Sequence, residues 1–196
     1  MRRAEVREEA ARAVRVIEEG LGIPTWWSGR VIFAPKGSAG VAWVNLHYDI
    51  VIYAGALRAL RRGPMIGMLY HEAAHTFSRA AGMYLPEHAL IEEVIAEIIA
   101  RRFRRRRSRG LPREERLLLY RMDREDAYAR PVAAFRRLCY SRGISPFAVA
   151  RELIVLNAKA RLERVEALFG DAWKSYAARF APEFSEWLKW TDPARS

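Results

Sequence analysis

The stretch LYHEAAHTFSRAAG, residues 69–82, decides how the rest of the chain is interpreted. It places two histidines and a glutamate, His71, Glu72 and His75, in a run whose other residues are mainly apolar or small. Helical residues four apart lie on one face with their Cβ atoms about 6 Å apart, so the two histidines can bind one metal ion together. Zinc suits them, because neutral imidazole is one of its preferred ligands.

Glu72 has a different position on the same predicted helix. It follows His71 directly and is therefore rotated about 100° around the axis from it. A carboxylate there can reach a metal-bound water without being a ligand, as a general base does. Gly67, one turn before His71 on the same face, leaves room for a close neighbour. The opposite face is predicted to be buried and carries Ile66, Leu69, Ala73 and Phe77.

A catalytic zinc site needs a third protein ligand, and His88, Glu92 and Glu93 are the candidates downstream. Glu93 and Glu97 fall together beside a strip of small residues, Ala89, Ala96 and Ala100, where another helix can approach closely. We therefore predict Glu93 as the third ligand, and Glu97 as the carboxylate that accepts a hydrogen bond from a ligand histidine. The alternative is that both belong to a solvated acidic flank of the helix.

Composition predicts one folded protein. With 196 residues, about half of them apolar, and six tryptophans, the chain can bury one good core, divided at most into two lobes. The single cysteine, Cys139, excludes an intrachain disulfide and favours a reducing compartment. The charged amino-terminal stretch does not resemble a signal peptide, and no apolar run is long enough for a membrane helix. These features predict a cytoplasmic protein without a membrane partner.

Hydrophobic periodicity predicts an α+β fold: a helix, a small antiparallel sheet, and then helices. The elements expected before the sheet ends are a helix at 3–19 and strands at 30–35, 40–45 and 49–54. After residue 55 we expect helices over 63–82 and from 86 to about 107, a linker at 108–112, and four or five shorter helices to residue 190. This order predicts a catalytic core over 1–107 and an all-helical lobe over 108–196, packed as one unit.

The motif and its spacing resemble a known family. HEAAH, followed after seventeen residues by EVIAEIIA, is similar to the gluzincin branch of zinc metallopeptidases. The pattern of Glu93, Ala96, Glu97 and Ala100 is particularly similar to ImmA/IrrE-like peptidases and to minigluzincins. Residues 40–55, GVAWVNLHYDIVIYAG, resemble the edge strand and adjoining strand that precede the active-site helix in thermolysin-like enzymes.

This resemblance implies a zincin-like core and a zinc metalloendopeptidase that acts on a peptide or protein substrate. His71, His75 and Glu93 would hold Zn2+, and Glu72 would be the general base. The peptide would lie extended along the edge strand near residues 40–45. The donor to the developing oxyanion stays open among Tyr84, Tyr120, Tyr128 and His47.

The segment RRFRRRRSRG, residues 101–110, holds seven arginines in a chain whose formal charge is +11. The cluster Arg101–Arg109 can bind nucleic acid or an acidic partner. It can equally be a solvated helix end that the helix dipole favours. The cluster also supports an alternative function, a basic helical protein that binds nucleic acid or protein and whose zincin core is degenerate or structural.

The carboxyl-terminal tail is the last feature with two interpretations. Trp187 and Trp190 fall on one helical face, and Asp192 follows them. The tail can be a lid over the cleft, or its tryptophans can close the core of the helical lobe.

Overall fold

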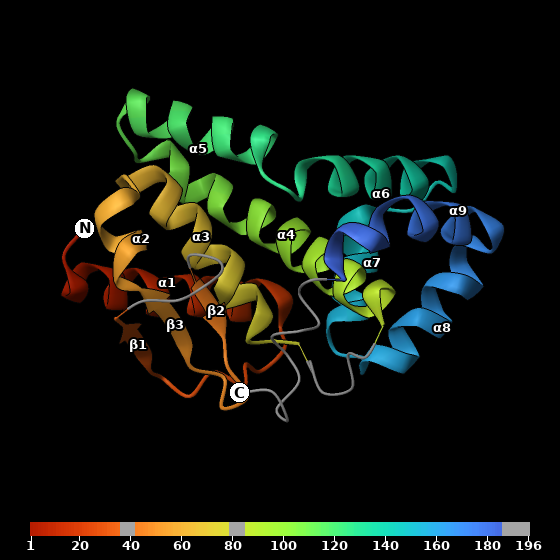
Figure 1. The fold of residues 1–196 in the computed structure, drawn as a ribbon, viewed down its shortest axis with the longest axis horizontal. Coiled ribbons are helices and arrows are strands. Elements are labelled where there is room, and N and C mark those ends of the chain that lie inside the picture. The colour runs from red at the N-terminus through yellow and green to blue at the C-terminus, as the bar shows by residue number, and fades with distance from the viewer. Residues whose placement is uncertain (36–41, 79–84, 186–196) are drawn as a thin grey trace. The chain divides into compact units, whose positions relative to one another are not determined.

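The computed structural model describes residues 1–35, 42–78 and 85–185 (Figure 1). Within these ranges, helices and one small three-stranded sheet make up the chain, so the fold is α+β. It divides into two compact units, unit 1 with residues 1–77 and 99–126, and unit 2 with residues 78–98 and 127–196. Helix α4, Pro86–Arg109, contributes to both. The division into a core at 1–107 and a lobe at 108–196 stays a prediction.

Unit 1 contains the sheet and the helices that surround the candidate site. Besides the second half of α4, its elements are α1 (Arg3–Leu21), β1 (Val31–Ala34), β2 (Ala42–Val44), β3 (Ile50–Tyr53), α2 (Ala54–Ala59), α3 (Arg62–His75) and α5 (Arg113–Glu125). The apolar residues of α1 recur at helical intervals and are buried. The helix ends at Leu21, two residues beyond the predicted end, and is followed by Gly22, which has a positive φ of 65°. Glycine adopts this conformation without steric cost.

The sheet is mixed, and the prediction of an antiparallel sheet is wrong. Its strand order is β1-β3-β2, with β1 parallel to β3 and β2 antiparallel to β3. The central strand β3 buries Ile50, Val51 and Ile52 in succession. A strand that is covered on both faces reads as a continuous apolar run, and such a run does not specify the direction of its neighbours. Strand β2 lies at an edge of the sheet, within the range 40–45 where an edge strand is expected.

A buried carboxylate fastens the hairpin between β2 and β3. The Asn45 side-chain oxygen accepts the backbone N–H groups of His47 and Asp49, at 3.0 and 2.9 Å. The Asp49 carboxylate then accepts hydrogen bonds from Ser28 at 2.5 Å, from Asn45 at 3.0 Å and from Arg30 at 2.9 Å. These bonds, with the one from Ser28 contributing most, lower the pKa of Asp49 to about 2. The loop before β1 is thereby tied to the hairpin.

Helix α3 packs very closely on α5 through two glycines four residues apart. A Cβ atom on Gly63 would lie 2.1 Å from the backbone oxygen of Glu115, and one on Gly67 would lie 2.5 Å from Met122 Cε and 2.6 Å from Leu119 Cδ1. The Gly63 N–H also donates to Glu115 Oε2 at 2.7 Å. The close neighbour expected at Gly67 is therefore α5.

Helix α3 ends earlier than predicted, at His75 instead of residue 82. The Thr76 hydroxyl donates to the carbonyl of Ala73 at 2.7 Å. The Thr76 carbonyl accepts the N–H of Trp26 at 2.9 Å, so a loop from outside the helix takes a bond that the next turn would have used. Residues 79–84 lie outside the described part of the chain, and α4 then begins at Pro86, as predicted.

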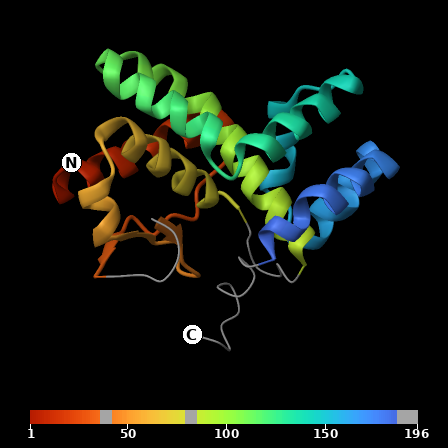
Figure 2. The ribbon, with the colours of Figure 1, turned by 45° about the horizontal axis from the view of Figure 1, so that its top comes forward.

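Unit 2 is helical in its described residues. After the first half of α4 come α6 (Ala129–Ser141), α7 (Pro146–Ile154), α8 (Ala158–Phe169), α9 (Asp171–Phe180) and the short 3-10 helix η1 (Ala181–Phe184). Helices α8 and α9 lie side by side (Figure 2). Aromatic rings fill the core, where Phe135 contacts Phe169 and Tyr176 at centroid distances of 5.8 and 5.9 Å. Cys139 is buried with them, and burial raises the pKa of its thiol to about 11.

Over the described residues, the helices are all too short or too polar to cross a membrane. The tail with Trp187, Trp190 and Asp192 lies outside these residues, so the lid and the core interpretations both stay predictions.

We predict that Gly63→Ala destabilises the protein. The added methyl group would meet the backbone of Glu115, which cannot move aside as a side chain can, so we expect a loss of roughly 1–3 kcal/mol in the free energy of unfolding. Chemical denaturation measures this loss. Gly55→Ala in α2 is the matched control, because a Cβ atom there meets nothing within 4 Å. Equal stability of the two variants would contradict the close α3–α5 contact.

Candidate metal centre

His71 and His75 lie one turn apart on α3, in line with Gly63 and Gly67. Their Nε2 atoms are 3.1 Å apart, and their rings meet edge to face with centroids 4.8 Å apart and planes at 78°. His71 is 7% exposed and His75 is half-buried. The two histidines therefore lie together as predicted, with their Nε2 atoms close to each other.

The separation of the two nitrogens can be compared with what a shared metal ion requires. Two bonds of 2.0–2.1 Å at a tetrahedral angle place the ligand nitrogens about 3.3 Å apart. The observed 3.1 Å between His71 and His75 is close to that value. The same distance suits a hydrogen bond from the Nε2–H of one neutral imidazole to Nε2 of the other, with the donor set by the tautomers. The pair consequently fits a metal ion with little rearrangement.

The rest of α3 supports this pair as expected. The predicted apolar face is buried, with Ile66, Leu69, Ala73 and Phe77 each at most 1% exposed. Tyr70, which precedes His71, is also buried, and burial raises its pKa to about 12, so its phenol stays neutral at physiological pH. Glu72 is 7% exposed and therefore provides a buried carboxyl group next to a predicted ligand.

The predicted partners Glu93 and Glu97 lie on the part of α4 that belongs to unit 2. Glu93 is 9% exposed and Glu97 is 2% exposed. The alternative of a solvated acidic flank is therefore wrong for both. Their roles as third ligand and as supporting carboxylate stay predictions.

Glu92, the competing candidate for the third ligand, forms a buried ion pair. Its Oε2 accepts the Ser78 hydroxyl at 2.6 Å and forms an ion pair with Arg161. The Arg161 guanidinium also donates to the backbone carbonyls of Leu153 at 2.8 Å and Ile154 at 2.9 Å. Glu92, Ser78 and Arg161 are all at least 98% buried. Glu92 is thus part of a buried ion-pair cluster in unit 2.

Arg161 is not among the predicted site residues, although the sequence carries a signal for it. Arg161 occupies the apolar face of α8, in a buried series with Ala158, Val165 and Phe169. A charged residue at such a position must find a buried partner, because an unpaired buried charge costs several kcal/mol. Its spacing in an otherwise apolar series therefore indicated a buried carboxylate elsewhere in the chain.

The described residues among the other polar candidates lie on different elements. His88 is buried in the first turn of α4, His47 is exposed in the β2–β3 turn, and Tyr120 is exposed on α5. Tyr128 precedes α6 in unit 2, and Tyr84 lies outside the described residues.

Comparison with known proteins gives one match of interest. Over 100 residues the chain is 32% identical to 3-deoxy-D-manno-octulosonic acid kinase of Xylella fastidiosa (strain 9a5c). The match covers 50% of this chain and 34% of that protein, so the chain spans about a third of the length of this curated relative. No family model and no solved structure matches the chain.

This match contradicts the predicted activity. A kinase transfers a phosphoryl group and does not hydrolyse peptide bonds, so the prediction of a zinc metalloendopeptidase, with its terms hydrolase and protease, is wrong. The predicted peptide or protein substrate depended on that activity and therefore loses its support. The motif led to the error because a metal-ligand pattern describes a donor set, and one donor set supports several reactions.

We predict that Arg161→Met lowers the free energy of unfolding by about 3–5 kcal/mol, because it leaves the Glu92 carboxylate buried without its cation. The double variant Arg161→Met with Glu92→Met removes both charges and should recover most of that loss. Arg164→Met, on the same helix, removes a half-exposed ion pair with Glu152 and should cost less than about 1 kcal/mol. A double variant no more stable than Arg161→Met would show that the cluster does not hold Glu92.

Proposed function

We propose that this chain is a metal-binding protein that holds a zinc ion through His71, His75 and Glu93. The observation that carries the proposal is the 3.1 Å separation of the two histidine Nε2 atoms, which is close to the spacing of two nitrogen ligands on one tetrahedral ion. Two imidazoles and a carboxylate are a donor set that suits zinc and leaves one position open.

Glu97 and Glu72 have supporting roles in this proposal. Glu97, buried one helical turn beyond Glu93, is the acceptor for an N–H of a ligand histidine, which fixes the orientation of the ring. Bound zinc would draw electron density from an oxygen ligand and so acidify it. Glu72, which follows His71 in the chain, contributes a buried carboxyl group next to a ligand. The gluzincin resemblance enters the proposal only as a metal-binding core.

We predict that the purified protein binds one equivalent of zinc. His71→Ala and His75→Ala should lose it, and Glu93→Ala should weaken it strongly. Glu97→Ala should raise the dissociation constant about 10–100-fold, as loss of a ligand's hydrogen-bond partner typically does. Metal content after desalting, and competition with a chromogenic chelator, measure these changes.

Two variants control for general effects on the protein. His47→Ala removes an exposed histidine, and Glu87→Ala removes a glutamate from the first turn of α4. Both should keep wild-type zinc affinity. Zinc retained by His71→Ala would refute the proposed centre, and zinc retained by Glu93→Ala would refute its third ligand.

A second candidate function is phosphoryl transfer, which the match to 3-deoxy-D-manno-octulosonic acid kinase favours. In kinases, metal ions and cationic side chains neutralise the charge that develops on the transferred phosphoryl group. The sequence contains neither GxxxxGK(S/T) nor GxGxxG, the glycine-rich motifs that bind nucleotide phosphates. In this candidate function, arginine side chains and a metal ion would bind the phosphates instead.

This second candidate predicts that the γ-phosphoryl group of ATP moves to a hydroxyl of 3-deoxy-D-manno-octulosonic acid and releases ADP. Mass spectrometry of the sugar and a coupled ADP assay, with magnesium or zinc, measure the transfer. ADP formation that requires the sugar supports the candidate. No sugar-dependent ADP above the level without protein would reject it, while the zinc measurements would stand on their own.

A further inference from the structure

The arginines in the carboxyl-terminal part of α4 lie in two rows. The inward row carries Arg101, Arg104 and Arg107. Arg104 is buried and pairs with Asp123 of α5, while Arg107 pairs with Glu9 of α1 at 2.8 and 3.0 Å. These two arginines hold α4 to its neighbours within unit 1, so they are structural.

Arg101 belongs to the same row. It donates to the Asp123 carbonyl at 3.0 Å and contacts the Asp126 carboxylate at 3.4 Å. Each of the three inward arginines therefore forms an ion pair within unit 1.

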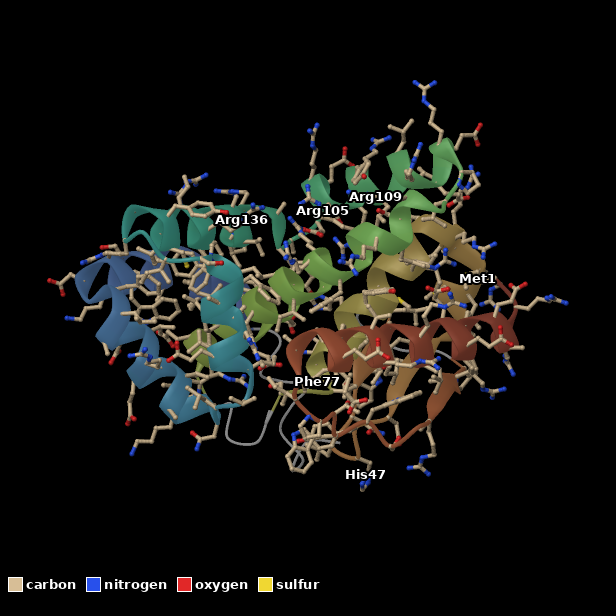
Figure 3. All side chains as sticks on the ribbon, turned by 180° about the vertical axis from the view of Figure 1, so that it is seen from behind. Met1, His47, Phe77, Arg105, Arg109 and Arg136 are labelled. Carbon is tan, nitrogen blue, oxygen red and sulfur yellow. The ribbon has the colours of Figure 1, made fainter. Side chains whose placement is uncertain are left out.

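The outward row carries Arg102, Arg105, Arg106 and Arg109, and all four are exposed. At 100° per residue they span an arc of about 100° on one side of the helix. The side chains of Arg105, Arg106 and Arg109 form no ion pair with any residue in the described ranges. Figure 3 labels Arg105 and Arg109 on α4. Three cations therefore share one exposed helix face without neutralisation.

The charge around this face is strongly one-sided. By sequence, unit 1 holds 21 lysine and arginine residues against 12 aspartate and glutamate residues, whereas unit 2 holds 13 against 11. Nine of the eleven excess charges thus belong to unit 1. The stretch from 98 to 113 contains no acidic residue.

We infer that Arg105, Arg106 and Arg109 form a binding face for the phosphate backbone of double-stranded nucleic acid. The three positions lie within about 6 Å along the helix axis. A duplex offers about one negative charge per 1.7 Å of its axis, and the guanidinium group matches phosphate geometry with two donors. A dense, regular row of anions therefore suits this dense row of cations.

A single strand fits this face less well, because it is held largely by stacking on aromatic rings. The aromatic residue in the segment is Phe103, and its ring faces α1. A Cβ atom on Gly20 would lie 2.0 Å from Phe103 Cε1, so the ring fills the space that this glycine leaves. The outward face consequently offers charge and no stacking surface.

Binding of the full chain to a short fluorescent DNA duplex, measured by anisotropy over a range of salt concentrations, tests this inference. The triple variant Arg105→Gln, Arg106→Gln, Arg109→Gln should bind more weakly. The slope of log affinity against log salt should become shallower by about 2.7, since each lost phosphate contact removes about 0.9. The matched control is Arg130→Gln, Arg136→Gln, Arg137→Gln, three exposed residues on α6, which removes the same charge from unit 2.

Support requires that the α6 control keeps the wild-type slope while the α4 variant loses it. Equal losses in the two variants would mean that net charge alone attracts DNA, and absence of duplex binding by the wild type would also overturn the inference. Polyglutamate that displaces the duplex at equal charge concentration would assign the face to an acidic protein instead. If the triple variant does not fold, Arg105→Gln with Arg109→Gln replaces it, with an expected change of about 1.8 in slope.

Discussion

A buried guanidinium joins three helices of unit 1. Arg104 of α4 pairs with Asp123 of α5, and its Nη1 donates to the Gly67 carbonyl of α3 at 3.4 Å. A buried charge without its partners costs several kcal/mol of folding free energy. Arrangements of these three helices that separate Arg104 from its partners are therefore disfavoured. Gly67 is also one of the two glycines at which α3 lies close against α5, and the histidines follow it at intervals of four residues. The direction in which His71 and His75 point is therefore set by contacts that lie one and two turns away from them.

Features that depend on neighbours in the sequence were predictable. The helix near the amino terminus, the start of α4 at Pro86, and the pairing of His71 with His75 follow from helical periodicity and from the backbone preferences of proline. Each needs only a few residues of context. The same reasoning correctly indicated a close neighbour at Gly67, although it could not say which element that neighbour would be.

Features that depend on distant residues were not predictable in this way. Strand β1 pairs with β3 in parallel. An antiparallel pairing would bury Ile50 and Ile52 equally well, so the apolar pattern does not distinguish the two. The end of α3 depends on a hydrogen bond from Trp26, some fifty residues earlier. The task of Glu92 is set by Arg161, sixty-nine residues later. The prediction of the activity was wrong for a related reason. The spacing of ligands indicates which groups can bind an ion, but it does not specify the reaction that the ion supports.

The single cysteine gives the protein a practical property. Cys139 is buried in unit 2, and with a pKa of about 11 its thiol is almost entirely protonated near neutral pH. Thiolate is the reactive form, so maleimide and related reagents should leave the native protein unmodified. A cysteine introduced at an exposed position would then be the sole point of attachment for a spectroscopic probe. Individual surfaces of either unit can be labelled in this way without first removing a natural thiol from the core.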